Sequence, residues 1–256
     1  MNNIILTLCL LTSLLINIAA YAGTANEIKK AERIIALSPH SVEMLFAMGA
    51  GDKIVATTEY ADYPVEAKKI ERIGGFQGIL IERVLELNPD LIIIWQSGNK
   101  LEQSEQLKKL GFNLYYSQPT SLNSIANELI DLGELVGHQA QAKKLAEQFN
   151  RHLAKVSQQY ANKKPVKVFY QLWPEPLQTA AGSSWIQHMI KLCQGDNIFS
   201  DAVNDYPKVS LENVVIRSPE VLIMPLANYQ NKPDDINWQD WPELPAVKNK
   251  QLYHLD

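Results

Sequence analysis

Aromatic side chains stand at the ends of several predicted strands, where a ligand could contact them. The stretch TTEYADYP (57–64) follows the apolar segment DKIVA and offers two tyrosines, two acids and a proline, without a nucleophile–base pair or a glycine-rich loop. Further rings lie in GGFQG, LIIIW and VFYQLW, so that the set comprises Tyr60, Tyr63, Phe76, Trp95 and Trp173. Rings collected from several loops suit a large, flat, partly apolar ligand. These residues therefore predict binding through contact with ring faces.

Motifs of covalent and phosphate chemistry are absent from the sequence. It contains no G-x-x-x-x-G-K-[ST], no G-x-G-x-x-G after a strand, no H-E-x-x-H and no G-x-S-x-G. The five histidines include no pair at a metal-ligand spacing, and His40, in LSPH after the first predicted strand, is the best placed for a site. We expect no catalytic residue, no metal site and no cofactor. A hydrolase with dispersed catalytic residues stays open as an alternative.

The elements that must position these residues alternate along the first half of the chain. ERIIALSP, DKIVATT, LIIIW and FNLYYS read as strands, and the segments between and after them have helical spacing with glycine or proline ends. Such alternation is typical of a parallel sheet with helices on its faces. In open sheets of this kind, ligands bind outside the carboxyl ends of the strands. The aromatic residues therefore fall at the edge where a site is expected.

A long helix separates this first series from a second one. Residues 139–163 contain no glycine or proline and are rich in Ala, Gln, Lys and Leu, which are mostly good helix formers. Their apolar stripe consists of Leu145, Phe149, Leu153 and Val156. We predict an α/β fold of two Rossmann-like lobes with central parallel sheets, residues 23–138 and 165–256, joined by one long α-helix over 139–164.

An internal repeat supports the division into two lobes. IERVLELNPDLIII (81–94) and LENVVIRSPEVLIM (211–224) align without a gap at a constant spacing of 130 positions, which pairs Glu82 with Glu212 and Pro89 with Pro219. Each glutamate opens a predicted helix, where a negative charge is stabilising by a few tenths of a kcal/mol. As a symmetric pair, the two could also dock on basic pockets of a two-fold partner.

The N-terminal segment predicts export. IILTLCLLTSLLINIAA is apolar and runs into Ala20-Tyr21-Ala22, an A-x-A cleavage pattern, so residues 1–22 are interpreted as a signal peptide cleaved near Ala22. A single N-terminal membrane anchor is the alternative. The formal net charge of −4 argues against a nucleic-acid partner, because nucleic-acid binders usually present a basic face.

One cysteine, Cys193, lies outside the predicted signal peptide. A lone thiol is unusual in an oxidising compartment, so either it is buried and inert or its partner is missing. The chain ends on QLYHLD, which reads as a strand without a following helix to cover it. We therefore suspect that the sequence is truncated and that the lost segment held the partner of Cys193.

Three segments resemble a known family. RIIALSPHSVEMLFAMGAGDKIVATTEYADYP, GGFQGILIERVLELNPDLIIIW and KVSLENVVIRSPEVLIM are similar to the helical-backbone (class III) substrate-binding proteins of ABC importers, which carry cobalamin, haem or iron siderophores. Y-x-D-Y-P, the aromatic-Gln-Gly at 76–78 and Trp95 resemble the cobalamin branch more closely, although Phe76 stands where a tryptophan is usual. The resemblance implies a periplasmic protein that holds a corrinoid between two rigid lobes.

The resemblance also implies roles for individual residues. Glu82 and Glu212 match acidic residues that meet arginines on the inner-membrane permease, and Cys193 matches a disulfide cysteine whose partner lies in a C-terminal helix not contained in this sequence. By position, several aromatic residues match the family's ligand contacts. The ligand-binding set predicted from these matches and from the strand ends is Tyr60, Phe76, Gln77, Trp95, Trp173 and His40.

The leading hypothesis is a monomeric periplasmic binding protein that delivers cobalamin to an ABC permease dimer with its ATPase. Cobalamin is then the transported ligand and not a cofactor. A haem or ferric-siderophore binder is the alternative within the same class, although an anionic siderophore would favour a cation cluster that the predicted site loops lack. A secreted α/β hydrolase and a surface adhesion module are the alternatives from other classes.

Overall fold

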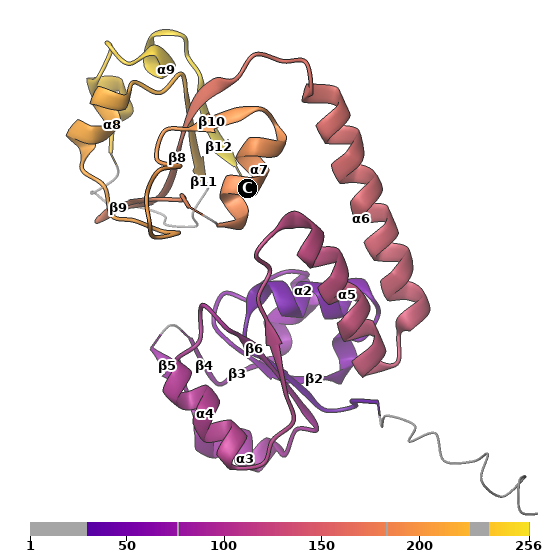
Figure 1. The fold of residues 1–256 in the computed structure, drawn as a ribbon. Helices are drawn as coiled ribbons and strands as arrows, with labels where there is room; N and C mark the ends of the chain where they lie inside the picture. The colour runs from indigo at the N-terminus through magenta and orange to yellow at the C-terminus, as the bar shows by residue number, and fades with distance from the viewer. Residues whose placement is uncertain (1–29, 76, 183, 226–235, 256) are drawn as a thin grey trace, which may run out of the picture.

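The computed structural model describes residues 30–75, 77–182, 184–225 and 236–255. The predicted signal peptide, Phe76 and the loop after residue 225 therefore lie outside the described residues. Two α/β lobes are visible, with the long helix α6 running beside both (Figure 1). The predicted fold class is confirmed, because each lobe is built on a central parallel sheet. Within the described residues, no helix is both long and apolar enough to cross a membrane.

The first lobe contains a five-stranded sheet in the order β3-β2-β1-β6-β7. All four pairings along this sheet are parallel. Its strands are β1 (Ile34–Ala36), β2 (Ile54–Thr57), β3 (Glu71–Arg72), β6 (Leu91–Trp95) and β7 (Leu114–Ser117). A separate two-stranded antiparallel hairpin is formed by β4 (Gly74–Gly75) and β5 (Gly78–Ile79).

Helices cover both faces of this sheet because its buried strands alternate their side chains between two apolar clusters. Ile34 and Ile93 join the cluster beneath α2 (Pro39–Ala47) and α5 (Leu122–Val136). Ile35 and Ile92 join the opposite cluster beneath α3 (Ile81–Leu87) and α4 (Leu101–Lys109). Short 3-10 turns, η1 (Gly51–Lys53) and η2 (Val65–Lys69), complete the lobe.

The connecting helix α6 (Gln139–Tyr160) begins immediately after α5 and packs against it. Ala142 and Ala146 of α6 are buried, and Leu145 and Phe149 pack against the core of the first lobe. The two helices approach closely at Gly133 of α5, where an added Cβ would lie 2.2 Å from the Ala142 Cβ. Small residues on both helices therefore set how α6 leaves the first lobe.

The second lobe contains a sheet in the order β10-β8-β11-β12, with all three pairings parallel. A further strand, β9, pairs antiparallel with the end of β8. Strand β12 corresponds to the strand that the segment QLYHLD predicts at the end of the chain. The elements are β8 (Val166–Pro174), β9 (Leu177–Thr179), α7 (Trp185–Leu192), β10 (Gly195–Asn197), α8 (Leu211–Arg217), β11 (Val221–Pro225), η3 (Trp238–Asp240), α9 (Pro245–Lys248) and β12 (Leu252–Leu255).

The predicted repeat is present in three dimensions. Helices α3 and α8 have seven residues each, and each ends in a left-handed residue before a proline. These residues, Asn88 (φ 43°) and Ser218 (φ 54°), keep the spacing of 130 positions. The acids two residues later, Asp90 and Glu220, each accept a backbone N–H at the start of the first strand of their lobe, from Arg33 just before β1 and from Lys167, the second residue of β8. The two halves therefore share local geometry as well as sequence.

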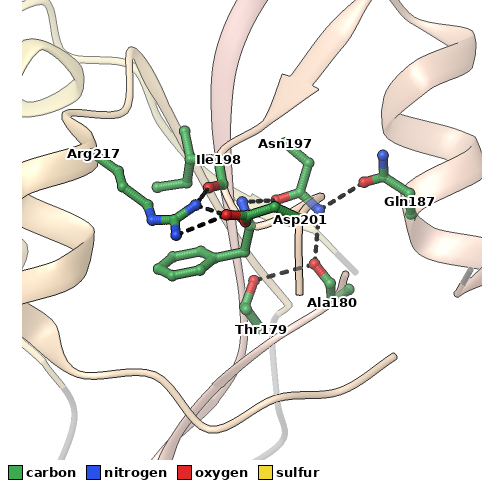
Figure 2. Close-up of polar contacts among 8 residues, drawn as sticks. Thr179, Ala180, Gln187, Asn197, Ile198, Asp201 and Arg217 are labelled. Carbon is green, nitrogen blue, oxygen red and sulfur yellow. Dashed lines mark hydrogen bonds and ion pairs between the residues drawn. The ribbon is translucent and has the colours of Figure 1, made fainter. Parts of the chain in front are cut away.

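Polar contacts hold α8 and α7 to the last residue of β10 and the segment that follows it (Figure 2). The Arg217 guanidinium binds both carboxylate oxygens of Asp201, at 2.7 and 3.0 Å, and lies 4.6 Å from the centre of the Phe199 ring. The Asn197 amide donates at 2.7 Å to the Ala180 carbonyl and at 2.7 Å to Gln187 Oε1. These contacts fix the position of the helix that carries Glu212.

Cys193 is a free, exposed cysteine next to the end of α7. The alternative of a buried and inert thiol is therefore wrong, because the residue caps an amphipathic helix on the side that faces solvent. The predicted disulfide stays a prediction.

We expect Gly133→Ala to destabilise the protein by up to about 2 kcal/mol. The new methyl group would overpack the α5–α6 contact, which costs about 1–3 kcal/mol, and the better helix propensity of alanine offsets about 1 kcal/mol of that cost. Urea unfolding measures the difference. Asn127→Ala, at an exposed position of the same helix, is the control and should be neutral or slightly stabilising; equal stability of both variants would contradict the packing argument.

Candidate functional site

The carboxyl ends of β1 and β6 form the topological switch point of the first lobe. β1 pairs in parallel with β2 on one side and with β6 on the other, so the connections leave in opposite directions and open a crevice for ligands. His40 follows β1, in the first turn of α2, and Trp95 is the last residue of β6. Their rings meet edge to face, with centroids 5.5 Å apart. The structure thus brings together two of the predicted site residues.

Trp95 is held by the turn that follows it. Its backbone N–H donates to Asn99 Oδ1 at 2.7 Å, and the Asn99 amide donates to the Leu37 carbonyl at 3.0 Å, which ties the end of β6 to the end of β1. A Cβ at Gly98 would lie 2.0 Å from the Trp95 ring, so the indole rests directly on this glycine. The ring is half-buried and keeps part of its surface open to a ligand.

His40 belongs to a chain of polar side chains that runs into the lobe. Its Nε2 lies 2.9 Å from Ser117 Oγ and 3.3 Å from Ser38 Oγ. Ser117, the last residue of β7, donates its hydroxyl to Glu128 Oε2 at 2.7 Å. Glu128 lies on α5, is buried, and also accepts the Gln118 N–H at 2.8 Å. The chain therefore connects the switch point with the α5 helix.

Burial controls the charges of this chain. Desolvation lowers the pKa of His40 to about 4, so its imidazole is neutral at pH 7. Desolvation raises the pKa of Glu128, and the hydrogen bonds from Ser117 and Gln118 act in the opposite direction. The switch point consequently presents a neutral ring beside an indole, which suits an uncharged ligand surface better than a carboxylate.

The loop after β2 presents Tyr60 with its side chain 72% exposed and its backbone at φ 66°. A non-glycine residue in this region is uncommon and marks a position that the surroundings constrain. The constraint comes from Glu59, whose N–H donates to the Gly74 carbonyl at 2.8 Å, and from Arg72, which binds the Ala61 carbonyl at 2.8 Å. The predicted binding residue is thus held exposed on an ordered loop.

The β4–β5 hairpin carries Gln77, which is exposed, next to the predicted Phe76, which lies outside the described residues. The Gln103 side chain of α4 pairs with both backbone groups of Ile79, at 3.0 and 2.8 Å, as a strand would.

The second lobe contributes Trp173, which is half-buried near the end of β8 and donates its Nε1–H to the Glu175 carbonyl at 2.9 Å. A small pocket lies behind the hairpin and is lined by Leu37, Gly75, Gly78, Ile79, Asn99, Lys100, Gln103, Ser104 and Leu107.

Glu82 and Glu212 are both exposed in the first turns of α3 and α8. Within the described residues neither glutamate forms an ion pair, and the neighbouring arginines Arg83 and Arg217 pair with other acids. Arg83 pairs with Glu71 at 2.6 Å. The Glu212 backbone N–H and the Ser210 hydroxyl lower the pKa of Glu212. Both helices therefore present a carboxylate side chain on an exposed residue.

Three site residues escaped the sequence analysis: Asn99, Ser117 and Glu128. Asn99 could have been noticed because Q-S-G-N follows a strand, where Gly and Asn typically build turns. Ser117 and Glu128 offer no such signal, since a serine at a strand end and a glutamate in a helix are ordinary. Across the described residues, no group of three His, Cys, Asp or Glu side chains could hold a metal ion.

Two α/β lobes related by an internal repeat, with a neutral aromatic edge and a stiff connecting helix, are the architecture of a binding protein for a bulky small molecule. The chain belongs to the periplasmic binding protein family, whose sequence model matches residues 34–256.

Individual members of this family and solved structures are similar to the chain over most of its length. The vitamin B12-binding protein of Vibrio parahaemolyticus is 38% identical over 226 residues, which cover 88% of this chain and 81% of that protein. The crystal structure of the periplasmic vitamin B12 binding protein of Vibrio cholerae superposes with a TM-score of 0.81 at 40% identity and covers 88% of each chain. A periplasmic haem-binding protein from Roseiflexus has a TM-score of 0.76 at 24% identity and covers 88% of this chain and 89% of its own, which shows the shared fold alone.

The neutral state of half-buried His40 predicts a pH-dependent stability. Its pKa is about 4 in the folded protein and about 6.5 in an unfolded chain, so the unfolded state binds the proton first as the pH falls. The stability is present above pH 6.5 and is lost toward pH 4. Between pH 7 and pH 5 we expect the free energy of unfolding to fall by about 1–2 kcal/mol more in the wild type than in His40→Gln.

Urea unfolding at the two pH values measures this difference. His152→Gln, on an exposed position of α6, is the matched control and should keep the wild-type dependence. Parallel pH profiles of wild type and His40→Gln would show that His40 is not held neutral by the fold.

Proposed function

We propose that the protein captures cobalamin in the periplasm and delivers it to an ABC importer. The observation that carries this proposal is the 40% identity and TM-score of 0.81 to a solved periplasmic vitamin B12 binding protein over 88% of both chains. The neutral His40–Trp95 pair at the switch point supports it, because a corrinoid is a large ring system with an uncharged amide periphery. The haem-binding relatives at 24% identity or less support only the common fold.

Binding would rest on ring contact from both lobes. We assign ligand contacts to the six predicted residues: Tyr60, Phe76, Gln77, Trp95, Trp173 and His40. Covering one ring face contributes roughly 1–2 kcal/mol, about half of a full side-chain burial. Four rings and a few hydrogen bonds of about 1 kcal/mol each are sufficient for micromolar binding or tighter. No charged pair is required.

We further propose that the protein is not an enzyme and that cobalamin is its cargo, without a resident cofactor. The family and the relatives are binding proteins, which supports this role over the hydrolase alternative.

Residues 1–22 would direct export and be removed near Ala22, and the mature protein would act as a monomer. Cys193 would form a disulfide, and its exposed thiol is compatible with that.

Delivery would use the two equivalent helices. Glu82 and Glu212 would contact basic residues of the permease dimer, which works with its ATPase. The support is their exposure, the repeat spacing, and the ion pairs that occupy the adjacent arginines. Exposed ion pairs contribute roughly 0–1 kcal/mol each, so such contacts would orient a complex that can still dissociate.

Titration with cyanocobalamin tests the ligand assignment. We expect a one-to-one complex by isothermal calorimetry, with quenched tryptophan fluorescence. Trp95→Ala should weaken binding about tenfold, because it removes one ring contact of roughly 1–2 kcal/mol. Tyr160→Ala, at the end of α6 away from the strand ends, should bind like the wild type. A flat calorimetric trace for the wild type would reject the proposal.

Charge reversal tests the docking role. The double variant Glu82→Lys, Glu212→Lys should bind cyanocobalamin normally but support slower uptake in vesicles that contain the importer, since two attractive contacts become repulsive. Glu102→Lys, in the first turn of α4, places the same charge on another exposed helix start of the first lobe and should leave uptake unchanged. Normal uptake by the double variant would remove the docking role.

A further inference from the structure

The polar chain behind the switch point has a fixed direction. Glu128 accepts two hydrogen bonds, from the Gln118 N–H at 2.8 Å and from the Ser117 hydroxyl at 2.7 Å. A serine hydroxyl has a single proton to donate, so Ser117 can only accept at its contact of 2.9 Å with His40 Nε2. Nε2 must therefore carry a proton. In a neutral imidazole, the other nitrogen then has a free lone pair.

The second nitrogen of His40, Nδ1, is not completely buried. In the described part of the chain, the ring forms its hydrogen bonds through Nε2. Every buried side-chain nitrogen or oxygen in that part has a partner, so an Nδ1 without one is not buried. The Trp95 ring restrains the imidazole plane at an interplanar angle of 84°. The lone pair is thus held in a defined orientation at the switch point.

We propose that Ser117 and Glu128 are positioning residues that hold His40 in the Nε2–H form, so that Nδ1 accepts a hydrogen bond from an amide N–H of the bound ligand. The inference rests on the proposed function for the class of ligand. It adds a determinant of specificity within that class, since neither Ser117 nor Glu128 contacts the ligand in this arrangement.

The chemistry of this acceptor discriminates between the candidate ligands. The periphery of a corrinoid carries primary amides, which can donate to a neutral nitrogen. Carboxylates, such as the propionates of haem or the groups of many siderophores, only accept hydrogen bonds when ionised. They would face the Nδ1 lone pair without a proton between them, which leaves both acceptors unsatisfied. The polar chain from Glu128 through Ser117 to His40 therefore favours an amide-bearing ligand.

An isosteric substitution at Glu128 should reverse the direction of the hydrogen bonds in the polar chain, which tests the inference. In Glu128→Gln, the side-chain carbonyl must still accept the Gln118 N–H, so the new NH₂ group faces Ser117. Ser117 then turns its proton toward His40 Nε2, and the imidazole proton moves to Nδ1. ¹⁵N NMR of histidine-labelled protein distinguishes the two tautomers. We expect the Nε2–H form in the wild type and the Nδ1–H form in Glu128→Gln.

Affinity provides the second readout. Glu128→Gln and His40→Ala should both bind cyanocobalamin about three- to tenfold more weakly by calorimetry, the effect of one lost hydrogen bond. Glu134→Gln, exposed on the same helix, is the matched control and should keep the wild-type tautomer and affinity. Ser117→Ala should give a mixture of tautomers, because Nε2 loses its main acceptor.

Two results would overturn the inference. One is a Glu128→Gln protein that folds and keeps the Nε2–H form, and the other is a reversed tautomer with wild-type affinity. A wild-type protein that shows the Nε2–H form but does not bind cyanocobalamin would instead reject the proposed function, so the two failures are distinguishable.

Discussion

The remaining structure depends on one strand pairing that occurs in both lobes. In each lobe, the first strand pairs in parallel with the strand that follows the helix–proline unit. β1 pairs with β6, and β8 pairs with β11. Parallel pairing aligns the carboxyl ends of the strands at one edge. Residues that are far apart in the sequence, such as His40 and Trp95, then meet there. The loop that carries Tyr60 begins at that same edge, at the end of β2, and Trp95 ends β6 there.

The same constraint explains why the site is neutral. Burial of polar groups at a sheet edge is costly unless they are hydrogen-bonded, and the switch point satisfies its groups through Asn99, Ser117 and Glu128. The nearby arginines serve the scaffold. Arg72 binds the carbonyls of the tyrosine loop, and Arg83 pairs with Glu71. The surface left for a ligand at this point consists of rings and a neutral imidazole.

The two lobes are more alike in the elements that support the strand ends than in the strand ends themselves. The α3 and α8 helices, the left-handed residues that end them, and the acids that bind the entry to the central strand all recur at one spacing. The ends of the central strands differ, because His40 follows β1 whereas β8 continues into an antiparallel pairing with β9. Symmetric helices suit a two-fold partner, and asymmetric strand ends suit a ligand without symmetry.

The amino-acid sequence alone determined the order of the elements, the long helix, the repeat and the aromatic positions at strand ends. These features depend on local periodicity, on glycine and proline, and on spacing, all of which can be read along the chain. It could not show that Asn99 fastens Trp95 to β1, that Gly98 supports the indole, or that Glu128 orients His40 through Ser117. Those contacts join residues from different elements, so only the tertiary structure decided them. The charge of His40 was decided in the same way, because burial lowers its pKa and burial is a property of the fold.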